Sequence, residues 1–236
     1  MTATEEEKNV NGVDGDELVL RVDGTEPLSL AAVRAVEAVC ARADALGAAG
    51  GTGVLPVLLS GAPAGSWTAD ADVALVTKWE RALRRLERVG MTTIATATGD
   101  VGGLALDVLL TTDLRIVTPD TRLLVAVGDG ATWPGMAAYR LTVQAGVAPV
   151  RRAVLFGHPI AAAEARAMGL VHEVEEDTAK ALIVATEAAA ELSGRELAIR
   201  RQLMHEAAHT SFENALGAHL AACDRALRQA PARAAS

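Results

Sequence analysis

The chain has 236 residues, of which 50% are hydrophobic and only 3% aromatic, so aliphatic side chains must fill one large core. Its formal net charge of −8 at pH 7 argues against nucleic-acid binding, which needs a basic surface. No apolar run reaches the length of a membrane span and the acidic N-terminus is unlike a signal peptide, so we expect a cytoplasmic protein without membrane partners. The two cysteines, Cys40 and Cys223, are far apart and have neither zinc-site nor disulfide-framework spacing.

Strand and helix patterns alternate along the first two-thirds of the chain, and helical patterns fill the rest. Strands are expected at 18–22, 54–59, from Thr92, from Asp113 and at 170–174, with 122–127 strand-like or irregular. Helices are expected from the N-cap Ser29, at 73–89, around Asp107, within 136–157, at 161–168, and from 178 onward with a break at 193–194. This order predicts an α/β fold with a helical C-terminal appendage.

The expected division of the chain follows the same patterns. Residues 1–17 are acidic and poor in apolar side chains, which predicts a flexible tail. Residues 18–174 form the core, 175–228 the C-terminal helical region, and the Pro/Ala-rich stretch 229–236 a frayed end.

The segment 92–119, TTIATATGDVGGLALDVLLTTDLRIVTP, organises this chain. It predicts a β-branched strand, a glycine turn, a short helix carrying Asp107, and a second strand led by Asp113. A glycine turn that opens a helix can hold an anion, because the first amides of a helix have no partner within it.

Several short motifs occur in a fixed order. They are DLRI at 113–116 with PDTR at 119–122, WPG at 133–135, GHPIAAAEARAMGLVHEV at 157–174, and FENAL at 212–216. Together they resemble the crotonase family, the enoyl-CoA hydratases and isomerases, over nearly all of 18–227. The resemblance implies a crotonase-like ββα spiral core, with C-terminal helices that assemble homotrimers or paired trimers.

The same resemblance implies an acyl-CoA ligand and no separate cofactor. The thioester oxygen would lie between two backbone N–H groups, those of Ala69 and Leu104, which stabilise the charge of an enolate. Asp70 stands where the family usually has glycine, so the backbone there is expected to differ. Leu104 and Ala105 replace two glycines of the family's turn and are expected to crowd the passage of the acyl group.

Family hydratases use two carboxylates, one to activate water and one to deliver a proton. The first corresponds to Asp107, one methylene shorter than the usual glutamate. The second corresponds to Val127, counted back from WPG at 133–135, and valine cannot transfer a proton. Asp129 is the alternative second acid, although residues i and i+2 of an extended segment share a side without sharing a position. Asp107 also reads as a first-turn helix acid, and Asp129, Asp113, Asp70 and Asp72 as turn or cap residues.

A competing motif lies near the C-terminus. HEAAH at 205–209 has the spacing of a helical zinc-protease site, with two histidines on one helix face around a glutamate. Zinc needs a third ligand in an enclosed cleft, for which His219 and Asp224 are the candidates. A solvated helix face is the preferred interpretation, so no metal is expected, and His158 and His172 are interpreted as structural or surface residues.

The phosphates of CoA require cations that the sequence does not localise. The candidates are Arg84, Arg85, Arg151, Arg152, Arg200 and Arg201, each of which reads equally well as part of a charged helix face.

The acidic chain with one of two carboxylates is most similar to the accessory crotonase-like proteins of dihydroxyphenylglycine biosynthesis. There, the family assists a type III polyketide synthase in forming 3,5-dihydroxyphenylacetyl-CoA for antibiotics. Three hypotheses follow. The chain is an enzyme that helps to dehydrate and aromatise a CoA-linked polyketide, a non-catalytic partner of the synthase or of a second crotonase-like protein, or an ordinary enoyl-CoA hydratase or isomerase.

Overall fold

The computed structural model describes residues 18–49, 53–65, 67–68, 71–128, 130–189 and 195–234. The acidic segment 1–17 and the break expected at 193–194 lie outside the described residues. Within the described parts, no helix is both long and apolar enough to pass through a bilayer.

A parallel sheet forms the centre of the molecule. Its strands β1 (Leu20–Asp23), β2 (Val54–Gly61), β3 (Thr92–Gly102), β4 (Leu114–Val117) and β9 (Glu173–Val174) lie side by side in the order β1-β2-β3-β4-β9. The far end of β3 pairs with β5 (Arg122–Leu124), which in turn pairs with β8 (Ile160–Ala161). The strands β6 (Val127–Gly128) and β7 (Ala131–Thr132) form a separate antiparallel pair.

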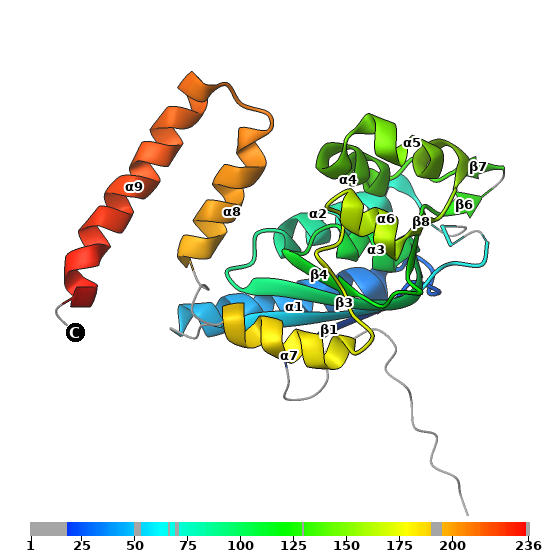
Figure 1. Cartoon of the computed structure of the whole chain (residues 1–236), viewed down its shortest axis with the longest axis horizontal. Helices are drawn as coiled ribbons and strands as arrows, with labels where there is room; N and C mark the ends of the chain where they lie inside the picture. Colours follow the sequence, from blue (N-terminus) through cyan, green and yellow to red (C-terminus); the bar gives the residue numbers. More distant parts are fainter. Residues whose placement is uncertain are drawn as a thin grey trace, which may run out of the picture.

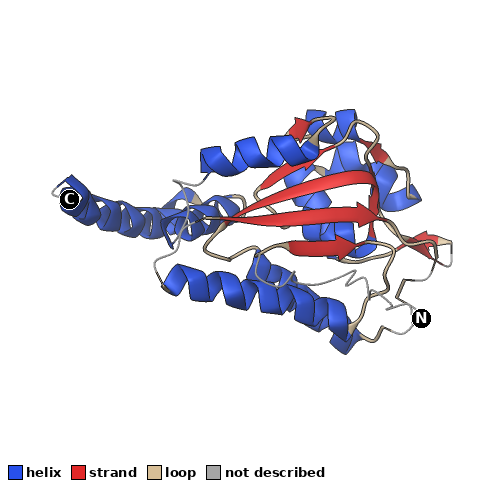
Figure 2. Ribbon diagram, turned by 90° about the horizontal axis from the view of Figure 1, so that it is seen from below, coloured by secondary structure: helices blue, strands red, loops and turns tan. Residues whose placement is uncertain are grey.

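Helices cover both faces of this sheet (Figures 1 and 2). On one face lie α1 (Leu30–Ala48), α2 (Val73–Leu86) and α3 (Gly103–Leu109), and on the other α7 (Thr178–Ala189) packs on β3 and β4. The helices α4 (Met136–Ala145), α5 (Val147–Phe156) and α6 (Ala162–Ala167) gather at one end of the molecule. The α/β class expected from the alternating patterns is therefore confirmed.

The predicted helix starts are confirmed at two caps. The Ser29 hydroxyl accepts a hydrogen bond from the Ala32 N–H at 3.2 Å, and an Asp72 carboxylate oxygen accepts one from the Leu75 N–H at 2.7 Å. Such caps satisfy amides that have no partner within the helix.

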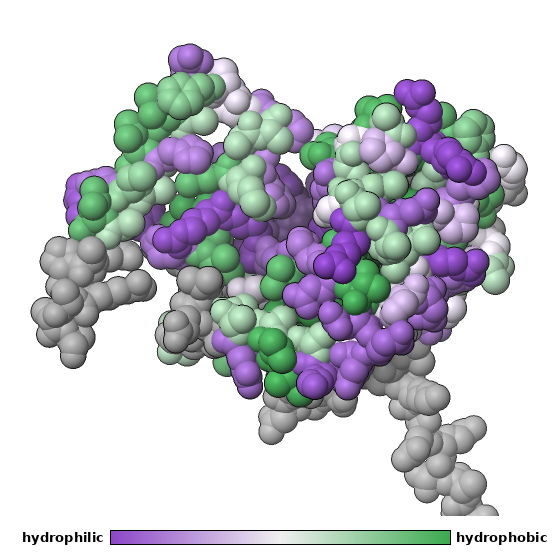
Figure 3. Space-filling model, in the orientation of Figure 1, coloured by the Kyte–Doolittle hydropathy of each residue, from purple (hydrophilic) through white to green (hydrophobic). Residues whose placement is uncertain are grey.

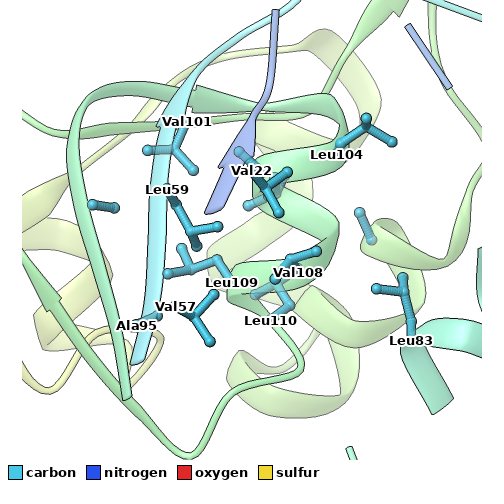
Figure 4. Packing of buried hydrophobic residues seen from close by; sticks show 14 of the residues in the cluster. Val22, Val57, Leu59, Leu83, Ala95, Val101, Leu104, Val108, Leu109 and Leu110 are labelled. Atoms are coloured by element: carbon cyan, nitrogen blue, oxygen red, sulfur yellow. The ribbon is translucent and has the colours of Figure 1, made fainter. Parts of the chain in front are cut away.

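The short helix α3 is enclosed on every side, because all of its residues are buried. Figure 4 shows its side chains Val108 and Leu109 gathered with Val57 and Leu59 of β2. Its position inside the core makes α3 a rigid base for any group that it carries.

The two C-terminal helices, α8 (Arg195–Ala207) and α9 (Phe212–Ala234), pack on each other and extend away from the sheet (Figure 1). They are separated at 208–211, where the helical pattern was expected to continue. Helix α9 continues through 229–234, the stretch expected to fray. No side chain of α9 from Phe212 to Arg228 is buried, so the helix has a free surface in the single chain.

Candidate active site

The ends of three parallel strands meet in close backbone contact. A Cβ atom on Gly24, just after β1, would lie 2.2 Å from the carbonyl oxygen of Gly61 and 2.4 Å from that of Gly102. Only glycine fits at such a distance. The first residue of α3, Gly103, has φ +51°, a conformation that glycine adopts without strain. The turn that opens α3 is therefore fixed at the carboxyl edge of the sheet, where open α/β sheets bind ligands.

Leu104, the proposed oxyanion donor, is the second residue of α3. Its side chain is fully buried in the core cluster, and Ala105 is equally buried. Both side chains, which were expected to crowd the passage of an acyl group, are thus part of the core. The backbone N–H of Leu104 belongs to the first turn, whose amides have no partner within the helix.

Ala69 and Asp70 lie outside the described residues, so the second proposed donor stays a prediction. The flanking residue Trp67 contacts Trp133 edge to face, with ring centroids 6.1 Å apart. This contact brings the loop between β2 and α2 next to the turn after β7. The sequence motifs contain both tryptophans, but nothing in their spacing indicated that the rings touch.

Asp107 lies one turn after Leu104 and is only 5% exposed. Its Oδ2 accepts a hydrogen bond from the indole Nε1–H of Trp79 in α2, at 2.9 Å. Burial raises the pKa of the Asp107 carboxyl to about 7, which the Trp79 hydrogen bond opposes; nearby Glu80 raises the pKa further and Arg140 lowers it. The sequence patterns did not predict that Trp79 contacts Asp107, although a buried indole N–H requires an acceptor.

A network of charged side chains leads from the Trp79–Asp107 pair toward the surface. The Arg140 guanidinium donates to Glu80 at 2.9 Å and to Glu87 at 3.1 Å, and Arg84 donates to Glu87 at 2.6 Å. Arg84, a candidate for binding CoA phosphate, forms an ion pair with the Glu87 carboxylate instead. Arg85 is likewise paired, with Asp44 at 2.7 Å.

The residue that the motif spacing assigns to the family's second acid position, Val127, has an aliphatic side chain. Val127 lies in β6 and is 49% exposed. A Cβ atom on Gly157 (φ +65°) would come within 2.5 Å of the Val127 Cγ2 atom, so the valine packs directly on the turn after α5. Asp129, the alternative acid, lies outside the described residues.

A cleft of about 660 Å³ separates the C-terminal helices from the core (Figure 3). It is lined by the segment that follows α3, by α4, by the turn between α6 and β9, and by the end of α8, including Thr111, Asp113, Tyr139, Gln144, His172 and His205. The cleft thus lies at the C-terminal end of α3, away from the Gly103–Leu104 turn.

Arg201 and Asp113 fasten α8 to the core. The Arg201 guanidinium donates two hydrogen bonds of 2.6 Å to Asp113, and further ones to the carbonyl oxygens of Val89 and Met91. Asp113 also accepts from the N–H and hydroxyl of Thr93. The structural interpretation of Asp113 is confirmed, and Arg201 is a buried anchor; the other candidate cations, Arg151, Arg152 and Arg200, are exposed.

The end of helix α8 contradicts the zinc-protease interpretation of 205–209. Helix α8 ends at Ala207, so His205 and His209 do not share one helix face. Within the described ranges, no three His, Cys, Asp or Glu side chains gather as a metal site. His172 is structural, as predicted: its Nδ1 accepts from the Arg115 N–H at 3.1 Å.

The sequence is similar to those of known proteins. The sequence profile of the enoyl-CoA hydratase/isomerase family matches residues 64–235. An enoyl-CoA hydratase of Amycolatopsis orientalis is 56% identical over 213 residues, covering 90% of this chain and 97% of that protein.

Solved structures share the fold at low identity. A putative enoyl-CoA hydratase of Streptomyces coelicolor A3(2) superposes with a TM-score of 0.72 at 20% identity, covering 97% of this chain and 90% of that one. An enoyl-CoA hydratase of Shewanella pealeana gives a TM-score of 0.73 at 18% identity, covering 89% and 83%. The crotonase-like core expected from the motifs is thereby confirmed.

Proposed function

Because the chain belongs to the enoyl-CoA hydratase/isomerase family of the crotonase superfamily, we propose that it acts on a CoA thioester through an enolate. The amides of Leu104 and Ala69 hold the thioester oxygen, and Asp107 transfers the proton. The observation that carries this proposal is the buried Asp107 carboxyl with a pKa of about 7, one turn after Leu104 on a rigid helix.

Enolisation of a thioester needs both the N–H donors and the Asp107 carboxyl. Asp107 takes a proton from the α-carbon, and the electron pair of the C–H bond moves to the thioester oxygen, where preorganised N–H donors stabilise the negative charge. A carboxyl with a pKa near the working pH suits this task, because it both accepts and returns the proton. Enolisation requires a single acid–base group, whereas hydration requires two.

We place the reaction on a CoA-linked polyketide, where the protein assists dehydration and aromatisation to 3,5-dihydroxyphenylacetyl-CoA beside a type III polyketide synthase and a second crotonase-like protein. What supports this substrate is the single carboxylate. Dehydration and aromatisation of a polyketide proceed through enolates, and the sequence motifs assign Val127, which has no carboxylate, to the position of the second acid.

With crotonyl-CoA as substrate, we expect hydration to be at least about 10²-fold slower than in a hydratase that has both carboxylates. Val127 lacks the carboxylate that would hold or protonate the water, and loss of such a group costs about 10²–10⁴-fold in rate. Chromatography detects the hydration product, 3-hydroxybutyryl-CoA, directly. Robust formation of that product would favour the ordinary hydratase instead.

A non-catalytic partner role is the second candidate, and the enclosure of Asp107 favours it. A carboxylate that is 5% exposed and bonded to Trp79 also suits a purely structural part of the core. The two roles differ in the effect of removing the carboxylate: loss of activity marks the catalytic role, and unchanged activity marks the non-catalytic one.

The oligomeric state is also a proposal. Helix α9 exposes Phe212, Leu216, Leu220 and Leu227, spaced by one or two helical turns along one face, between 41% and 74% of each side chain, and such an apolar stripe marks an interface. We expect a homotrimer formed through this helix, with three times the mass of one chain by light scattering. Leu220→Asp should reduce that mass. A parent protein with the mass of a single chain would contradict the proposal.

A further inference from the structure

Trp79 makes a buried hydrogen bond to which the proposed reaction has so far assigned no role. Its side chain is 1% exposed in α2, and its indole N–H donates to Asp107 Oδ2 across the packing of α2 on α3. An indole has a single donor, and this one is directed to the only carboxylate that the proposed site contains among the described residues.

We propose that Trp79 is a positioning residue, whose indole N–H holds the Asp107 carboxylate in one rotamer with Oδ1 directed to the α-proton of the thioester. This inference rests on the proposed role of Asp107. A fixed carboxylate gains rate because the reacting atoms are already oriented before the proton moves. The hydrogen bond to Oδ2 also stabilises the charged form of Asp107.

The choice of a neutral donor has a consequence for proton transfer. A salt bridge would hold the carboxylate as firmly, but it would lower the pKa of Asp107 well below neutrality. The charged groups near Asp107 are Glu80 of α2 and Arg140 of α4, which act on its pKa in opposite directions. Trp79 therefore fixes the geometry of Asp107, while burial keeps its pKa near 7.

The first test reads the hydrogen bond without any activity. The chain contains three tryptophans, so the indole region of a ¹H–¹⁵N spectrum has three signals. We expect the Trp79 indole signal to shift with pH, with a midpoint near 7 set by Asp107. The signal is identified by its loss in Trp79→Phe. The Trp133→Phe variant is the matched control, since it removes a different indole signal and leaves the titrating one.

The second test uses phenylacetyl-CoA in D₂O, whose α-deuteration reports enolisation by one acid–base group. Trp79→Phe keeps an aromatic ring in the core and removes only the donor. We expect its exchange rate kcat to fall at least tenfold with little change in KM. We also expect its pH–rate midpoint to move up by about one unit, because a hydrogen bond to a charged group is worth about that much.

The outcomes separate this inference from the proposed function. If Asp107→Asn is inactive while Trp79→Phe keeps the parent rate and midpoint, the positioning role is overturned and the proposed function stands. If Asp107→Asn retains full exchange, both are overturned. Should Trp79→Phe fail to fold, the parent protein decides without any assignment, because three indole signals that all stay constant from about pH 5 to 9 overturn the hydrogen bond to a titrating carboxylate.

Discussion

Replacing Asp107 by asparagine is expected to lower α-deuteration of phenylacetyl-CoA by about 10²–10⁴-fold, the usual contribution of a general acid–base group. Asparagine has nearly the shape of aspartate, and its carbonyl oxygen still accepts the Trp79 indole N–H that now binds Oδ2. The fold should therefore survive while the proton acceptor is lost. The rate is measured by mass spectrometry, and the fold by circular dichroism and thermal unfolding.

Asp44→Asn is the matched control for this substitution. Asp44 lies in α1, and its exposed pair with Arg85 contributes little to stability, so the exchange rate should stay at the parent level. In a reconstitution with a type III polyketide synthase, Asp107→Asn should also abolish any enhancement of product formation. Full enhancement by this variant would refute the catalytic role and favour the non-catalytic partner.

Stability should depend on pH through the same carboxyl. The pKa of Asp107 is about 7 in the folded chain and near 3.8 when unfolded, so the folded state binds the proton more tightly. Its stabilising contribution is complete below about pH 4 and is lost as the pH rises through about 7. In Asp107→Asn this dependence should disappear, which makes the variant gain stability relative to the parent between these pH values.

The elements and their ends were largely predictable because their signals are local. The Ser29 and Asp72 caps, the glycines before α3 and the β-branched run of β3 each act within a few residues, and the structure confirms them. The break between α8 and α9 also had a local signal, since the Ser211 hydroxyl accepts from the Asn214 N–H at 3.3 Å. Reading Ser211 as a cap would have excluded the zinc motif.

The contacts that define the site were not predictable, because they join residues far apart in sequence. Trp79 and Asp107 are 28 positions apart and meet only through the packing of α2 on α3. Arg201 and Asp113 are 88 positions apart, and a surface arginine looks the same in sequence as a buried one. The sequence patterns placed Asp107 on a short helix after a glycine turn, as the structure has it, but only the packing shows that its carboxyl is buried and hydrogen-bonded.

Arg201→Ala is expected to lower the free energy of unfolding by about 3–5 kcal/mol, the usual cost of removing one partner of a buried ion pair. The Arg201 side chain is 4% exposed, and it is hydrogen-bonded to Asp113 and to the carbonyl oxygens of Val89 and Met91. Its removal leaves the Asp113 charge with Thr93 as its hydrogen-bond donor among the described residues and releases α8 from the core. Urea unfolding at one fixed protein concentration measures the change.

Arg228→Ala provides the matched comparison, because Arg228 pairs with Asp224 one turn earlier on α9 and both side chains are largely exposed. A helix-surface pair of this kind contributes about 0.3–0.5 kcal/mol, so this variant should unfold almost as the parent does. Hydrogen exchange should show faster opening of α8 in Arg201→Ala alone. If Arg201→Ala costs less than about 1 kcal/mol, the guanidinium does not anchor α8, and Arg201 returns to the set of candidates for binding the phosphates of CoA.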